Sequence, residues 1–133
     1  MIFVDASAIV AILTREPEAE RLTVRLEAQS RRATSSIAVY EAALAVARKL
    51  DLSPEAAKVR VLGLLERLAV DVRPIGEEEG ILAIEAHARY GKGRHRAGLN
   101  MGDCFAYACA KLSGATLLYK GADFDLTDLR AGP

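Results

Sequence analysis

The sequence predicts an α/β fold, a three-layer α/β/α sandwich with a short, mainly parallel sheet. Short apolar segments alternate along the chain with longer segments whose apolar residues recur at helical spacing. The expected strands are apolar along their whole length rather than on one face, which is typical of parallel strands covered by helices on both sides. A length of 133 residues fits one domain with one core, so we expect a single domain over residues 1–133.

The N-terminal segment contains the first expected strand and two helices. The apolar run at residues 2–4 predicts a buried strand. Residues 8–13 have a helical pattern, and Ser7 is a plausible N-cap because its hydroxyl can accept a bond from a backbone N–H. Pro17 opens a second helix over residues 18–29, since proline is tolerated in a first helical turn.

The middle of the chain adds a strand and two longer helices. Residues 32–35 predict a second strand, after which Ser36 is expected to cap an apolar helix that ends near Leu50. Ser53 followed by Pro54 is a clear helix start. Apolar residues then continue at helical spacing to about Leu68.

The C-terminal half continues this alternation. Residues 69–73 predict a third strand, which Pro74 stops. Residues 77–90 predict a helix, whose three opening glutamates form a solvated face favoured by the helix dipole. A glycine-rich and basic loop follows at residues 91–98. Asn100 is expected to cap a helix that ends at Gly114, and residues 116–119 predict the last buried strand.

Composition and charge exclude several classes of protein. No apolar run reaches the roughly 18 residues of a membrane-spanning helix, and we expect no secretory signal. The 18 basic and 18 acidic side chains cancel, so nucleic-acid binding needs a local patch. Cys104 and Cys109 are the only cysteines. On one helix they point about 140° apart and cannot bridge, so we interpret them as reduced thiols of a cytoplasmic protein.

Four carboxylates stand alone among apolar residues: Asp5 after the first strand, Glu41 and Asp103 early in their helices, and Asp123 past the last strand. Ligands of open parallel sheets bind beyond the carboxyl ends of the strands, so all four can reach the same edge of the sheet. Carboxylates held close together do not all ionise unless a cation compensates them. An all-oxygen set of this kind favours Mg²⁺ or Mn²⁺ over zinc or copper.

Each of these carboxylates also has a purely structural interpretation. Asp5 could cap the next helix, and Asp103 could form a capping box with the residue three positions earlier. Asp123 could be a turn residue, and Glu41 could form a buried salt bridge with Arg48 or another cation. Because all four structural roles would have to occur together, a shared metal site is the favoured interpretation.

Several stretches of the sequence resemble the PIN domain, and the VapC-type toxins of bacterial toxin–antitoxin pairs in particular. Their order and spacing agree along essentially the whole chain. The matching stretches lie at residues 1–8 (MIFVDASA), 16–18 (EPE), 40–41 (YE), 99–108 (LNMGDCFAYA), 117–124 (LLYKGADF) and 127–129 (TDL).

The resemblance implies a Mg²⁺- or Mn²⁺-dependent endoribonuclease with the PIN fold. The acidic quartet of the family corresponds to Asp5, Glu41, Asp103 and Asp123. The family's small hydroxyl residue near the metal corresponds to Ser7, which we assign to substrate binding. The resemblance also implies an RNA substrate, a homodimer and a small inhibitory antitoxin.

These residues suggest a division of roles. We assign Asp5, Glu41 and Asp103 to metal binding, and Asp123 to a second ion or an outer shell. Family members often lack an acid at Asp125, which is either a spare ligand or a surface residue. No histidine is expected to act as general base, since His87 falls within a helix and His95 in a loop.

The basic loop before the Asp103 helix is the expected contact for substrate phosphates. It carries Lys92, Arg94 and Arg96 within five positions, together with His95. Contacts of this kind supply affinity without sequence information. The alternative is a solvated loop without a binding role.

Two other functions compete with a nuclease. A receiver-type phosphoacceptor domain is also doubly wound and keeps a lysine after its last strand, where Lys120 lies. It needs an acidic pair after the first strand and an aspartate after the third, and this sequence has Asp5-Ala6-Ser7 and Val72-Arg73-Pro74 there. A catalytically inactive binding module is the other alternative, against which the complete quartet argues.

Overall fold

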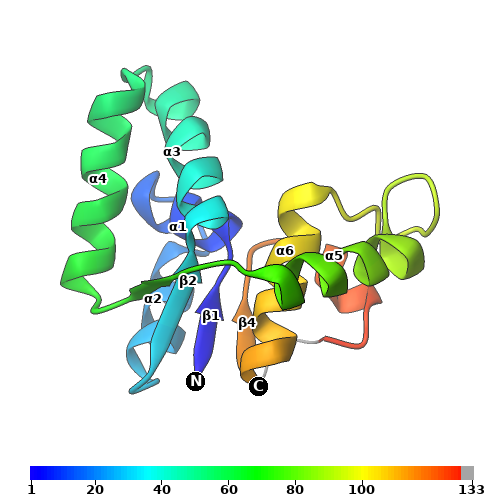
Figure 1. Cartoon of the computed structure of the whole chain (residues 1–133). Coiled ribbons are helices and arrows are strands. Elements are labelled where there is room, and N and C mark those ends of the chain that lie inside the picture. Colours follow the sequence, from blue (N-terminus) through cyan, green and yellow to red (C-terminus); the bar gives the residue numbers. More distant parts are fainter. Residues whose placement is uncertain (130–133) are drawn as a thin grey trace.

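A four-stranded parallel sheet forms the centre of the computed structural model, which describes residues 1–129 (Figure 1). The strands are β1 (Ile2–Val4), β2 (Arg32–Ser35), β3 (Asp71–Arg73) and β4 (Thr116–Leu118). Their order is β3-β2-β1-β4, and each neighbouring pair is parallel. The carboxyl ends of the central strands therefore meet at one edge of the sheet, where ligands of such folds bind.

Helices connect the strands and cover both faces of the sheet, which confirms the predicted fold class. The first four are α1 (Ala6–Leu13), α2 (Ala19–Glu27), α3 (Ser36–Leu50) and α4 (Pro54–Arg67). They are followed by α5 (Glu77–Tyr90), α6 (Met101–Ser113) and the short 3-10 helix η1 (Asp123–Leu126). Figure 1 shows α5 and α6 on one side of the sheet and α3 and α4 as an antiparallel pair at the other.

The alternation of side chains along β1 explains the two hydrophobic cores. Ile2 and Val4 join the apolar cluster formed with α1 to α4, whereas Phe3 joins the cluster formed with α5 and α6. All three side chains are almost completely buried. A strand with both faces buried has no polar side, and this is why the sequence reads as a continuous apolar run.

Three predicted boundaries were wrong in ways that have physical causes. Helix α1 begins at Ala6, and its N-cap is Asp5 rather than Ser7, because the Asp5 carboxylate accepts a bond from the Ser7 amide. The cap of α3 is Ser35, one position before the expected Ser36. Strand β3 begins only at Asp71, because Ala69 adopts a left-handed conformation (φ 51°) that ends α4.

Strand β3 also differs from the expected buried strand. It lies at the edge of the sheet, and its three residues are exposed. None of the helices described between residues 1 and 129 combines the length and the apolar character needed to cross a membrane.

Candidate active site

Asp5 forms the base of a cavity at the carboxyl edge of the sheet. It directly follows β1, is 4% exposed, and accepts bonds from the backbone amide (3.1 Å) and hydroxyl (2.5 Å) of Ser7. The structural role that the sequence allowed is therefore real, because Asp5 caps α1. Asp5 also lines a cavity of about 330 Å³ together with Ser7, Glu41 and Asp103. We call this space the acidic cavity.

Glu41 reaches the acidic cavity from the second turn of α3 and lies against the start of α6. A Cβ atom placed on Gly102 would come within 2.0 Å of a Glu41 carboxylate oxygen. Only glycine therefore leaves room for this carboxylate at its present position. Among residues 1–129 no ion pair joins Glu41 to Arg48 or to another cation, so the expected alternative of a buried salt bridge does not form.

Asp103 combines a capping role with a place in the acidic cavity. Its amide donates to Asn100 Oδ1 (2.8 Å), and its Oδ2 accepts from the Asn100 amide (3.0 Å). This is the capping box that the sequence allowed. Because Asp103 also lines the cavity beside Asp5 and Glu41, the capping role and a binding role are compatible.

Burial raises the pKa of all three carboxyl groups, and the charge of Asp5 adds to the rise at Glu41 and Asp103. Burial raises the pKa of Glu41 to about 7, and the charges of Asp5 and Asp103 add to this effect. Burial also raises the pKa of Asp103 to about 6. The hydrogen bond from the Asn100 amide lowers this pKa, whereas the charges of Asp5 and Asp123 raise it. The pKa of Asp5 is raised by burial, although its bonds to Ser7 oppose the rise. Three acids that resist ionisation around one cavity favour the arrival of a cation.

Asp123 lies outside the lining of the acidic cavity. It is the first residue of η1 and is exposed, but its charge is near enough to raise the pKa of Asp103. In the described part of the chain, no three Asp, Glu, His or Cys side chains are close enough to hold one ion together. Carboxylate oxygens are suitable ligands for Mg²⁺ or Mn²⁺. Because these carboxylates lie too far apart in this structure, they would have to draw closer to hold one ion together.

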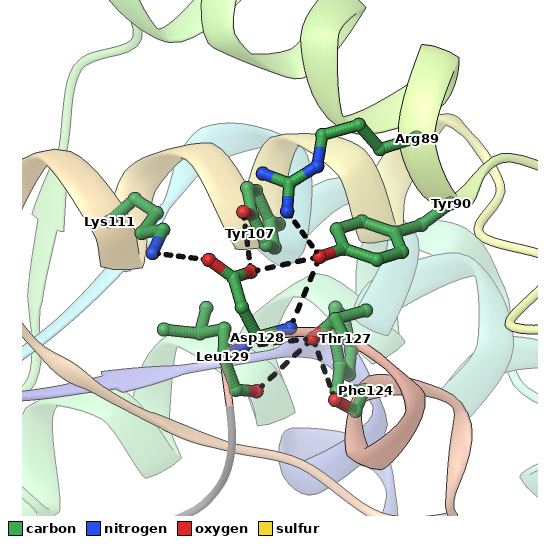
Figure 2. Close-up of polar contacts among 8 residues, drawn as sticks. All are labelled: Arg89, Tyr90, Tyr107, Lys111, Phe124, Thr127, Asp128 and Leu129. Atoms are coloured by element: carbon green, nitrogen blue, oxygen red, sulfur yellow. Dashed lines mark hydrogen bonds and ion pairs between the residues drawn. The ribbon is translucent and has the colours of Figure 1, made fainter.

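A cluster around Asp128 holds the segment after η1 in place (Figure 2). The Asp128 carboxylate accepts bonds from Tyr107 Oη (2.7 Å), Lys111 Nζ (2.6 Å) and Tyr90 Oη (3.3 Å). These donors belong to α5 and α6, so they fix the segment after η1 against both helices. We call these four residues the Asp128 cluster. Its hydrogen bonds were not predicted, because the partners of Asp128 lie 17, 21 and 38 positions away along the chain.

Asp125 bonds to a neighbouring tyrosine and does not line the acidic cavity. Its carboxylate accepts a hydrogen bond from the Tyr119 hydroxyl. Since it is also exposed and does not line the cavity, the structure favours a local structural role over a spare ligand.

The basic loop does not line the acidic cavity. Lys92, Arg94 and Arg96 are exposed, and Arg94 Nε donates to the Ala88 carbonyl oxygen (3.3 Å). Lys92 instead borders a separate, apolar cavity of about 400 Å³ between α5 and α6. The two cavities share only Asn100 among their lining residues. Phosphate binding by this loop therefore stays a prediction.

Cations from elsewhere in the chain line the acidic cavity. They are Arg48 and Lys49 at the end of α3 and Lys120 after β4. Glu16, from the turn between α1 and α2, binds both lysines. Sequence reasoning missed this group. The available signals were the position of Glu16 in a family-like stretch, that of Lys120 directly after the last strand, and Arg48 as a possible partner of Glu41.

Comparison with known proteins gives a consistent result. The PIN domain family matches residues 2–129. The VapC ribonuclease Mb0640 of Mycobacterium bovis is 43% identical over 134 residues, which cover 95% of this chain and 94% of that protein. The VapC ribonuclease R02377 of Rhizobium meliloti is 44% identical over 141 residues, which cover 97% and 99%.

A solved structure agrees in fold. The crystal structure of Mycobacterium tuberculosis VapC20, described as a toxin that cleaves the sarcin–ricin loop, aligns with a TM-score of 0.75 over 97% of this chain and 96% of that one, at 19% identity. These matches do not support the receiver-type alternative. The sheet order β3-β2-β1-β4 also differs from that of receiver domains of the CheY type, which have the order 2-1-3-4-5. The chain belongs to the PIN domain family.

Proposed function

We propose that the protein is a Mg²⁺- or Mn²⁺-dependent endoribonuclease, the toxin of a toxin–antitoxin pair. The observation that carries this proposal is the convergence of Asp5, Glu41 and Asp103 on one cavity at the carboxyl edge of a PIN fold. Two relatives named as VapC ribonucleases, at 43% and 44% identity over nearly the whole chain, support the reaction class.

The proposed chemistry is hydrolysis of a phosphodiester bond. A bound divalent cation supplies Lewis acidity and an activated water in such reactions. Asp5, Glu41 and Asp103 would hold the ion, and Asp123 would serve a second ion or an outer shell. The two bonds from Ser7 orient the Asp5 carboxylate, and the assigned substrate contact of Ser7 remains part of the proposal.

The raised pKa values of the acids explain why a cation would bind. At neutral pH the acidic cavity is reluctant to carry three negative charges, because burial and mutual repulsion favour the protonated acids. A divalent cation that takes the place of the protons compensates both the burial of these charges and the repulsion between them. The same repulsion would oppose an RNA phosphate until the ion is bound.

The proposed partners are an RNA substrate, a small antitoxin and a second copy of the chain. Large apolar side chains are exposed on the surface, among them Ile84, Met101 and Val59, each with about two thirds of its area or more accessible. Ile84 and Met101 both border the apolar cavity between α5 and α6, and exposed apolar residues grouped in this way support an interface with a protein. We also propose a cytoplasmic location, where a toxin of this class would meet RNA.

The decisive experiment is cleavage of a defined RNA panel with Mn²⁺ and with EDTA. Asp5→Asn, Glu41→Gln and Asp103→Asn should each lower the rate by about 100-fold or more, because carboxamides are poorer metal ligands of nearly the same shape. Glu55→Gln, on the exposed start of α4, is the matched control and should cleave like the wild type. Undiminished cleavage in EDTA, or full activity in any of the three variants, would contradict the proposal.

A further inference from the structure

The acidic cavity has a wall of opposite charge. Lys49 Nζ and Lys120 Nζ both contact the same oxygen, Oε1 of Glu16, at 2.9 and 2.7 Å. Arg48 lines the same cavity without an ion pair among residues 1–129. Glu18 is the other nearby acid, at 3.8 Å from Lys120 Nζ. We call the three cations Arg48, Lys49 and Lys120, together with the Glu16 carboxylate that binds both lysines, the cation wall.

Backbone geometry fixes Glu16 at this wall. Arg15 has a positive φ of 54°, a conformation that L residues seldom adopt, and it turns the chain out of α1. The Glu16 amide then donates to the Ala11 carbonyl oxygen (2.9 Å). The carboxylate is thereby held beneath the two lysines, although Lys49 and Lys120 lie 33 and 104 positions away along the chain.

Lys120 is tied directly to the site of the proposed reaction. Its backbone amide donates to Ser7 Oγ (3.0 Å), and the Ser7 hydroxyl donates to Asp5 (2.5 Å). One hydroxyl therefore connects the buried carboxylate with the residue that carries the ammonium group. The position of the cation wall relative to Asp5 is consequently built into the fold and does not depend on flexible side chains alone.

The two lysines keep hydrogen-bonding capacity for an anion. Each ammonium group has three donors, and Glu16 engages one from each. The side chains of Lys49 and Lys120 are 48% and 35% exposed, so the remaining donors can reach a ligand in the cavity. The hydrogen bond from Lys120, followed by that from Lys49, lowers the pKa of Glu16, which keeps this carboxylate ionised and both lysines in place at neutral pH.

We propose that Lys49 and Lys120 form a phosphate-binding subsite that holds the RNA backbone beside the carboxylates of the acidic cavity. This inference rests on the proposed ribonuclease function. A phosphodiester has to approach three acids that repel it, and two ammonium groups in the same cavity offset that repulsion. Lysine binds phosphate as a point charge, so the subsite reads the backbone and not the base sequence.

The test compares cleavage kinetics of the double variant Lys49→Ala/Lys120→Ala with those of the wild type. The KM for a single-stranded RNA should rise about tenfold, with kcat changed by less than about threefold, because the contacts are made to bound substrate before and during the reaction. The plot of log kcat/KM against log salt should become shallower by up to about 1.4, since roughly 0.7 counterions are released per phosphate contact on single strands. Mn²⁺ affinity measured by calorimetry should not fall, because neither lysine is a proposed ligand.

Three further variants separate the subsite from indirect effects. Lys58→Ala, on the exposed face of α4, removes one charge that does not belong to the cavity lining and should leave KM unchanged. Lys49→Arg/Lys120→Arg should keep most of the wild-type salt slope. Adding Glu16→Gln to the double alanine variant removes the carboxylate that has lost its partners. If that triple variant recovers the wild-type KM and slope, unpaired Glu16 caused the loss and the subsite is wrong.

Failure of the subsite can be told apart from failure of the function. If the wild type cleaves RNA with Mn²⁺ but the double variant keeps its KM and salt slope, only the subsite is contradicted. If the wild type does not cleave or bind RNA at all, both proposals are overturned.

Discussion

The acidic cavity and the Asp128 cluster both contain carboxylates next to α6, but their surroundings differ. Asp128 receives three hydrogen bonds from side chains, one of them from a lysine. Desolvation raises its pKa, but the bonds from Lys111 and Tyr107 outweigh this and lower it. In the cavity, Glu41 has no ion pair among the described residues, and its neighbours are other acids. The Asp128 carboxylate therefore stabilises the fold, whereas ionisation of the cavity carboxylates is costly without a compensating cation.

This difference predicts opposite responses to added metal. Mn²⁺ at about 100 times its dissociation constant should stabilise the wild type by roughly 2.7 kcal/mol. Asp103→Asn should gain much less. Without metal it should be as stable as the wild type or more stable, because one of the repelling charges is gone while the amide oxygen can still accept from Asn100.

Thermal melts of both proteins with EDTA and with Mn²⁺ measure this effect. Asp71→Asn, in the exposed edge strand, is the control and should respond to Mn²⁺ like the wild type. A loss of stability in Asp103→Asn that is the same with and without metal, together with no shift in the wild type, would leave Asp103 with its capping role alone.

The Asp128 cluster should show the reverse behaviour. Asp128→Asn removes the charge that Lys111 pairs with and weakens the bonds from Tyr107 and Tyr90. We expect a loss of about 1–2 kcal/mol, below the full value of a buried charged network because both ends of the ion pair are partly exposed. Urea unfolding should give the same loss in EDTA and in Mn²⁺. A loss that disappears with metal would mean that this cluster belongs to the ion site.

The pH dependence of stability should also distinguish the two regions. A raised pKa in the folded state means that folded Glu41 and Asp103 hold protons more tightly than the unfolded chain does. Their contribution is therefore present below the ordinary values of 4.5 and 3.8, and it is lost as the pH rises through about 7 and about 6. The metal-free protein should lose stability between about pH 4 and about pH 7, the interval between the ordinary and the raised pKa values.

Glu41→Gln should flatten this loss, and urea unfolding across the pH range in EDTA would measure it. Asp128 and Glu16 act at the other end of the scale. Their pKa values are lowered, so their contributions are lost only as the pH falls below their ordinary values of 3.8 and 4.5. A stability that rises steadily from about pH 5 to about pH 7 without metal would contradict the proposed repulsion in the cavity.

Local signals in the sequence predicted most of the fold. Apolar strands, proline at helix starts and Asn100 as a cap each depend on neighbours within a few positions, and the structure confirms the alternation and the parallel sheet. The errors are also local. Ser7 and Ser36 were expected as caps in place of Asp5 and Ser35, because several residues in a row could supply the capping oxygen and only the backbone path decides between them.

The candidate site was only partly predictable because much of it is assembled from distant segments. A lone carboxylate among apolar residues is visible in the sequence, and this found Asp5, Glu41 and Asp103. A polar residue whose sequence neighbours are also polar does not stand out in this way. Glu16 and Lys120 both lie in family-like stretches, but nothing in those stretches pairs them, and only the fold brings them together across 104 positions. Gly102 lies in a family-like stretch, but the reason why glycine is needed there becomes visible only when the position of Glu41 is known.

Gly102 therefore offers the smallest change in stability and a sharp test of the cavity. Gly102→Ala places a methyl group within 2.0 Å of the present Glu41 carboxylate, so that flexible side chain has to move. Alanine favours helix by up to about 1 kcal/mol over glycine, which offsets the displacement, and we expect stability to change by less than about 1 kcal/mol. RNA cleavage should nevertheless fall at least about tenfold, because a misplaced ligand costs transition-state stabilisation. Gly63→Ala in α4, where the new methyl group meets only Arg67 at 3.6 Å, should gain stability and keep full activity. Wild-type cleavage by Gly102→Ala would show that the observed position of Glu41 is not the one used in the reaction.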